Sequence, residues 1–107
     1  MITYSNNLYV SNSIKKRKIP AIKLGIKQGR GRLKLYLITL SNNDSDQLDI
    51  IHNSLLKQRL YRKLDLRIVG LANSREEATE LVIDMLNETI ESTGHCNIKD
   101  YLLTQFD

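Results

Sequence analysis

The sequence predicts an α/β fold: a small, three-stranded, mostly parallel sheet of βαβαβα form, with helices packed on it and a short C-terminal helix. Two apolar segments of strand-like composition, 33–40 and 64–72, and an amphipathic segment that starts at Ser74 predict this class. A length of 107 residues suits a single domain, 1–107, with one modest hydrophobic core.

The two apolar segments are predicted to be strands of one strand–helix–strand unit. Segment 33–40 is rich in aliphatic residues, and the second half of 64–72 is apolar at every position, which is typical of a strand covered on both faces. Asp44 or Asp46 can cap a helix between them, and such a unit is expected to cross over right-handed. The apolar residues of this intervening helix recur at helical spacing: Leu48, Ile51, Leu55, Leu56 and Leu60.

The most strongly indicated helix follows the second strand. Ser74-Arg-Glu-Glu77 is a capping box, and Gly94 is expected to end the helix as a left-handed C-cap. Asn97 can then cap a short last helix. The apolar stripe of the long helix consists of Ala78, Leu81, Val82, Met85, Leu86, Thr89 and Ile90.

The N-terminal third permits two interpretations. Residues 8–10 are a short strand candidate, and residues 14–26 have a helical stripe that Pro20 interrupts. Residues 22–27 also alternate with period two, which would suit a strand hairpinned onto 33–40. We favour the helix, because it makes three successive units of similar form.

Charge is distributed unevenly along the chain, whose formal net charge is +4. Residues 1–43 hold nine Lys or Arg and no Asp or Glu, whereas residues 73–107 hold eight acidic residues against Arg75 and Lys99. Such asymmetry points to partners rather than to a particular topology. Mutual neutralisation of the two ends within one subunit would be the simplest alternative.

The basic segment has the composition of a surface that contacts phosphate groups. Because no aromatic residue lies between Val10 and Leu35, it offers no platform for base stacking, so binding to nucleic acid would be electrostatic and tolerant of sequence. An anionic membrane surface or an acidic protein would also suit it. A solvated face, or an internal ion-pair partner for the acidic C-terminal part, is the simplest interpretation. The basic contact residues are Lys15, Lys16, Arg17, Lys18, Lys23, Lys27, Arg30, Arg32 and Lys34.

In the predicted topology, polar residues that follow the three strands share one rim at the carboxyl ends, where open α/β sheets bind ligands. The rim predicts a pocket for a small anionic ligand, although helix-cap and turn preferences alone also explain these residue types. The rim residues are Ser11, Asn12, Ser13, Asn42, Asn43, Asp44, Asn73, Ser74 and Arg75.

The long helix carries acidic residues at spacings of three or four, which places them along one ridge. A solvated outer face is the simplest interpretation, and contact with the basic segment of another copy is the functional one. These acidic residues are Glu77, Glu80, Asp84, Glu88 and Glu91.

No catalytic, metal or cofactor site is predicted. His52, His95 and Cys96 lack a framing motif, and Asp44, Asp46 and Asp49 match a cation loop poorly. A single cysteine and the absence of a long apolar run favour a cytoplasmic protein without membrane insertion. We therefore expect a non-enzymatic interaction or assembly module that self-associates as a homo-oligomer. A nucleic-acid-binding accessory protein that uses residues 15–34 is the first alternative, and a ligand-binding or catalytic domain at the rim is the second.

Overall fold

The computed structural model describes residues 2–29, 34–43, 45–58 and 64–106. Within these residues the elements follow one another as β1 (Ile2–Val10), η1 (Lys16–Lys18), α1 (Ile19–Lys27), β2 (Tyr36–Leu40), β3 (Leu48–His52), η2 (Asn53–Lys57), β4 (Leu66–Ala72), α3 (Arg75–Thr93) and α4 (Ile98–Leu103). The elements labelled η are short 3-10 helices.

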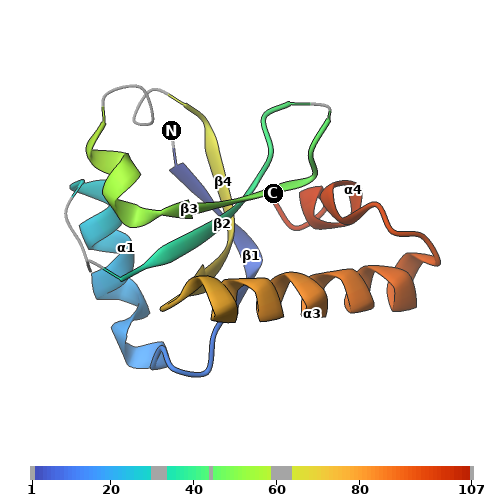
Figure 1. Cartoon of the computed structure of the whole chain (residues 1–107), viewed down its shortest axis with the longest axis horizontal. Helices are drawn as coiled ribbons and strands as arrows, with labels where there is room; N and C mark the ends of the chain where they lie inside the picture. The colour runs from blue at the N-terminus through green and yellow to red at the C-terminus, as the bar shows by residue number, and fades with distance from the viewer. Residues whose placement is uncertain (1, 30–33, 44, 59–63, 107) are drawn as a thin grey trace.

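The strands form a four-stranded mixed sheet in the order β1-β4-β2-β3 (Figure 1). β1 runs parallel to β4, whereas β2 is antiparallel to both β4 and β3. The predicted α/β class is therefore confirmed, but the three-stranded, mostly parallel arrangement is wrong. The difference matters for function, because β2 now ends at the opposite edge of the sheet from β1 and β4.

The main error in the prediction concerns residues 48–60, which were expected to form a helix. Residues 48–52 instead form β3, which pairs with β2 as a hairpin, and 53–57 form η2. Asn43 Oδ1 accepts hydrogen bonds from the backbone N–H groups of Ser45 (2.9 Å) and Asp46 (2.8 Å), so the polar stretch forms a turn rather than a helix cap. Residues 59–63 lie outside the described part of the chain.

The N-terminal third follows the favoured interpretation. The stretch 22–27 lies within the α-helix α1, with Pro20 in its first turn, where a missing N–H costs nothing. The strand before it is longer than the predicted 8–10, because β1 spans Ile2–Val10 with an irregularity in its pairing between Tyr4 and Tyr9. The polar residues 5–7 interrupt the apolar pattern that would have revealed the whole strand, although Ile2, Tyr4, Leu8 and Val10 all pack on the same core.

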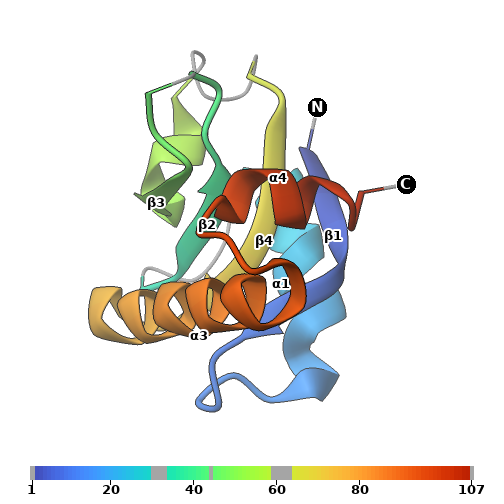
Figure 2. The same cartoon turned by 90° about the vertical axis from the view of Figure 1, so that its right-hand side faces the viewer.

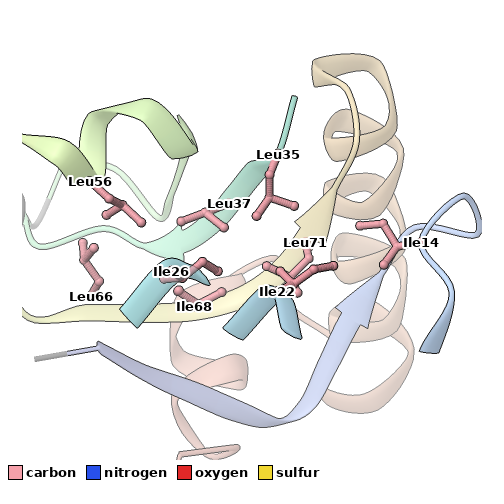
Figure 3. Packing of buried hydrophobic residues seen from close by; sticks show 9 residues of the cluster. All are labelled: Ile14, Ile22, Ile26, Leu35, Leu37, Leu56, Leu66, Ile68 and Leu71. Carbon is pink, nitrogen blue, oxygen red and sulfur yellow. The ribbon is translucent and has the colours of Figure 1, made fainter. Parts of the chain in front are cut away.

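One face of the sheet is covered by α1. Ile22 and Ile26 of this helix pack against sheet residues such as Leu37 and Leu71, as Figure 3 shows. All of them are at most 7% exposed. The helix therefore turns Ile22 and Ile26 to the sheet, whereas Leu24 and Lys27 are exposed and Lys23 is half-buried.

The other face of the sheet is covered by α3 and α4 (Figure 2), whose residues Leu81, Met85 and Leu102 pack on strand residues that include Ile38. α3 approaches closely at Gly70, where a Cβ atom would lie 2.9 Å from Ile38 Cδ1 and 3.1 Å from Met85 Cε. The helices α1 and α3 thus lie on opposite faces of one sheet.

The predicted ends of the two C-terminal helices are confirmed. Ser74 Oγ accepts from the Glu77 N–H at 3.1 Å, and Gly94 ends α3 in the left-handed region at φ 80°. The Asn97 side chain caps α4 by accepting from the Asp100 N–H at 3.2 Å.

Candidate functional site

A polar cluster at the carboxyl ends of β1 and β4 is centred on the carboxylate of Glu77. Its Oε1 accepts hydrogen bonds from Ser13 Oγ at 2.8 Å, Ser11 Oγ at 3.1 Å and the Asn73 N–H at 3.1 Å. Asn73 Nδ2 also donates to Ser13 Oγ at 2.8 Å. Because β1 and β4 are parallel, residues 60 positions apart or more meet here.

The cluster stabilises the ionised form of Glu77. The hydrogen bond from Ser13 lowers the pKa of this carboxyl group most, partial desolvation opposes the shift, and the bonds from Asn73 and Ser11 lower it further. The donors that the sequence assigned to a ligand are therefore directed at a carboxylate of the protein itself. An external anion at this point would have to displace Glu77.

The structure brings only part of the predicted rim together. Ser11, Ser13 and Asn73 meet at Glu77, and Asn12, Ser74 and Arg75 adjoin them in the chain. Asn42 and Asn43 follow β2, which is antiparallel to β4, so they lie at the opposite edge of the sheet. There Lys99 of α4 donates to the Asn43 carbonyl at 2.9 Å. The single shared rim is thus wrong, and Asp44 lies outside the described residues.

A small hollow of ≈ 410 Å³ adjoins the cluster at the start of α3. It is lined by cationic Lys34 and Arg75, by His52 and by acidic Glu76, among others. The Arg75 guanidinium carbon lies 5.9 Å from the centre of the Tyr36 ring, and His52 meets that ring edge-on at 5.0 Å between ring centres. Tyr36 and His52 thus line this hollow together with charged side chains of both signs.

Six cations of the basic segment lie on η1 and α1 or directly before them, and we call this group the basic layer. It consists of the cationic side chains of η1 and α1 and the residue before them: Lys15, Lys16, Arg17, Lys18, Lys23 and Lys27. All are exposed except Lys23, which is half-buried with its Nζ 4.6 Å above the centre of the Tyr4 ring. Lys34 lies in the hollow near Arg75, and Arg30 and Arg32 fall outside the described residues.

The acidic residues of α3 do not form the single exposed ridge that the sequence predicted. Glu77 is bound in the polar cluster, and Glu88 accepts from the Tyr101 hydroxyl at 3.2 Å. Glu80, Asp84 and Glu91 are exposed. Glu76 is exposed as well, and because it lies seven residues before exposed Ile83, it is on the same side of the helix. We call the exposed side of this helix the α3 outer face; it consists of Glu76, Thr79, Glu80, Ile83, Asp84, Asn87, Ile90 and Glu91.

The basic layer and the α3 outer face do not neutralise each other within a subunit. α1 packs on one face of the sheet and α3 on the other, and among the described residues no ion pair joins the two surfaces. The charge asymmetry of the sequence is therefore also an asymmetry of the folded molecule.

His52, His95 and Cys96 do not converge. His52 Nδ1 lies 2.7 Å from Ser54 Oγ at the start of η2, whereas His95 and exposed Cys96 follow the C-cap of α3. His95 Nδ1 accepts from the Asn97 N–H at 3.1 Å. Across the described residues, no group of three or more His, Cys, Asp or Glu side chains is arranged to hold a metal ion.

The chain matched no protein-family model, no curated protein and no solved structure at a significant level. No helix in the described ranges is long and apolar enough to cross a membrane. Function must therefore be inferred from the charged surfaces and the polar cluster themselves.

Proposed function

We propose that this chain is a non-enzymatic interaction module that assembles with further copies of itself, with the basic layer of one copy contacting the α3 outer face of another. One observation carries the proposal: two surfaces of opposite charge lie on helices that cover opposite faces of one sheet. In the part of the chain that the structure describes, no ion pair joins the two surfaces within one subunit, so both are available for pairing between copies.

The physical support is electrostatic complementarity. Six cations form the basic layer, while the α3 outer face carries four carboxylates, with exposed Arg75 beside Glu76 at the start of the helix. Exposed charges of opposite sign accelerate encounter and set orientation, whereas the apolar centre of a contact supplies most of its affinity. Contacts of this kind weaken as salt rises, because screening shortens the range of the interaction to about 10 Å at 0.1 M.

The basic layer also supports a second candidate, binding to a nucleic-acid backbone. Residues 1–43, which include all of its cations, contain no Asp or Glu. Lys23 lies over one face of the adjacent Tyr4 ring, so that face is a poor stacking surface for a base. Such binding would be sequence-tolerant and would decrease steeply with salt.

Sedimentation velocity over a concentration series, at about 0.05 M and about 0.5 M salt, tests the proposal. We expect the average mass to rise with protein concentration at low salt and to fall towards the monomer at high salt. A monomer at every concentration and both salt levels would refute self-association. Nucleic acid added to that monomer then tests the second candidate, through a salt-dependent shift in sedimentation.

Two matched variants locate the contact. Lys23→Gln with Lys27→Gln removes two positive charges from the basic layer, and Arg67→Gln with Lys99→Gln removes two from elsewhere on the molecule. Only the first pair is expected to weaken self-association. Equal effects from both pairs would show that net charge, rather than the basic layer, governs the assembly.

A further inference from the structure

An apolar groove interrupts the basic layer. It has a volume of ≈ 780 Å³ and lies between α1 and the start of β1, where Ile2, Pro20 and Leu24 contribute to its lining. Leu24 is 54% exposed, whereas Ile22 and Ile26 of the same helix are buried. Leu24 and this groove therefore provide apolar area for a contact in the middle of a cationic surface.

Two lysines border this groove. Lys23 and Lys27 both line it, and the Tyr4 ring holds the Lys23 ammonium group at 4.6 Å from its centre. A cation held over an aromatic ring loses less side-chain freedom when it meets an anionic partner. The groove thus combines an apolar floor with positive charge at a fixed position.

The α3 outer face carries the complementary pattern. Ile83 and Ile90 are 52% and 42% exposed, and their spacing of seven residues places both on one stripe of the helix. Glu80 and Asp84 flank Ile83, and both carboxylates are exposed. The face therefore presents two apolar side chains that are bordered on one side by carboxylates.

We infer that Ile83 and Ile90 of one copy insert into the α1 groove of a second copy, with Glu80 and Asp84 facing Lys23 and Lys27. This inference rests on the proposed self-association and specifies its contact. Apolar anchors beside exposed polar or charged groups are typical of protein interfaces, which have an apolar core and a polar rim. A second copy fits the groove better than an uncharged partner, because its anchors are accompanied by charges opposite to the lysines.

The placement of the two surfaces determines the type of assembly. A two-fold dimer uses the same surface patch on both subunits, whereas here the groove and the α3 outer face differ and lie on helices that cover opposite faces of the sheet. Each copy that docks by its α3 outer face leaves its own groove open for another. The assembly is therefore head-to-tail and grows into chains or rings.

Two variants that each block one surface test this geometry. Leu24→Lys places a cation in the apolar groove, and Ile83→Lys places one opposite Lys23 and Lys27. Each variant alone is expected to self-associate at least about tenfold more weakly than the wild type. An equimolar mixture is expected to form a 1:1 dimer and nothing larger, because each variant retains the surface that the other lacks. Asn42→Lys, which adds the same charge on an exposed loop, is the control.

The outcomes separate this inference from the proposed function. If the wild type self-associates but the mixture of blocked variants stays monomeric, the proposed head-to-tail contact is wrong, and the proposed function of self-association is retained. If the wild type is a monomer throughout, both are wrong. Leu24→Lys adds a cation to the basic layer, so it strengthens nucleic-acid binding if that is the true role.

Cysteine pairing gives a second readout that does not require an added charge. In a Cys96→Ser background, the Leu24→Cys and Ile83→Cys variants are mixed and oxidised. The inference predicts a disulfide between the two different variants in preference to a disulfide between identical ones. Preferential bonding of Leu24→Cys to itself would show an isologous contact through α1 and overturn the inference.

Discussion

Ser13 Oγ donates a hydrogen bond of 2.8 Å to Glu77 Oε1, which lies 64 residues further along the chain. The same oxygen accepts from Ser11 Oγ and from the Asn73 N–H, so one carboxylate connects the end of β1, the end of β4 and the first turn of α3. The hydroxyl and amide donors at this strand end therefore bind a carboxylate of the protein and hold three elements together, rather than binding a ligand.

Replacing Glu77 by Gln is expected to lower the free energy of unfolding at pH 7 and to reduce its dependence on acid. The folded state lowers the pKa of this carboxyl group. The carboxylate therefore contributes fully to the free energy of unfolding above the pKa of the unfolded chain, and this contribution is lost as pH falls through the folded pKa. Urea unfolding between about pH 7 and about pH 3 measures this contribution.

Glu80→Gln is the matched control for Glu77→Gln, because Glu80 is exposed on the same helix. The wild type and the Glu80→Gln variant are expected to lose stability in parallel as pH falls, with a shallower slope for Glu77→Gln. Three coincident pH profiles would show that the cluster does not favour the ionised carboxylate.

Tyr4→Phe is expected to leave stability at pH 7 unchanged or to increase it by up to about 1 kcal/mol. The Tyr4 hydroxyl is buried and has no hydrogen-bond partner among the described residues, so its removal eliminates a desolvated polar group. Chemical denaturation of the two proteins side by side measures the difference. A loss of stability well above 1 kcal/mol would indicate a bond to this hydroxyl.

The pH dependence of Tyr4 gives a separate prediction. Burial raises the pKa of Tyr4 to about 12. Below the unfolded value near pH 10 both states keep the proton, so this group does not make the free energy of unfolding depend on pH; as pH rises from there through the folded value, the free energy of unfolding falls. The difference in tyrosinate absorbance between wild type and Tyr4→Phe follows this group alone, and a transition near pH 10 would contradict the assigned burial.

Gly70→Ala is expected to destabilise the fold by about 1 kcal/mol or more, because the added methyl group would lie 2.9 Å from Ile38 Cδ1. The cost should decrease in an Ile38→Val background, which removes that atom. Gly94→Ala also destabilises, but through its φ of +80°, since nothing lies within 4 Å of the added group. Its cost is expected to be the same in both backgrounds, and equal rescue of both glycine variants would refute the close-approach explanation.

Gln47 is expected to stabilise the start of α4. Its Oε1 accepts from the Ile98 N–H at 2.6 Å and lies 3.4 Å from the Lys99 N, so the β2–β3 hairpin supplies acceptors to a distant helix. Gln47→Ala should cost about 1 kcal/mol and accelerate hydrogen exchange in 98–103, whereas Gln47→Glu retains an acceptor. Unchanged exchange in the alanine variant would show that the contact is dispensable.

Local signals predicted the C-terminal half of the fold well. The caps at Ser74, Gly94 and Asn97 work through neighbouring backbone groups, so the residues needed to recognise them are adjacent in sequence. The same capping box contained the signal for the polar cluster, because Glu77 of such a box reaches back towards the preceding backbone N–H groups.

Local sequence signals could not predict the β2–β3 hairpin or the order of the strands in the sheet. Leu48, Ile50 and Ile51 suit a helix or a two-sided strand equally, since Leu48 and Ile50 pack with one core and Ile51 with the other. The choice depends on pairing with β2 and on the Asn43 turn, and with β2 reversed, Asn42 and Asn43 move to the far edge. The prediction that the two charged surfaces are separate does not depend on the direction of β2, because it requires only that α1 and α3 lie on opposite faces of the sheet.

Zero-length cross-linking of a mixture of ¹⁴N-labelled and ¹⁵N-labelled protein, followed by mass spectrometry, tests the central claim most directly. This reaction joins only a lysine and a carboxylate that are in contact, and mixed isotopes identify links between different copies. We predict intermolecular links from Lys23 or Lys27 to Glu80 or Asp84. Intermolecular links confined to other pairs, or none under conditions in which the protein self-associates, would contradict the account.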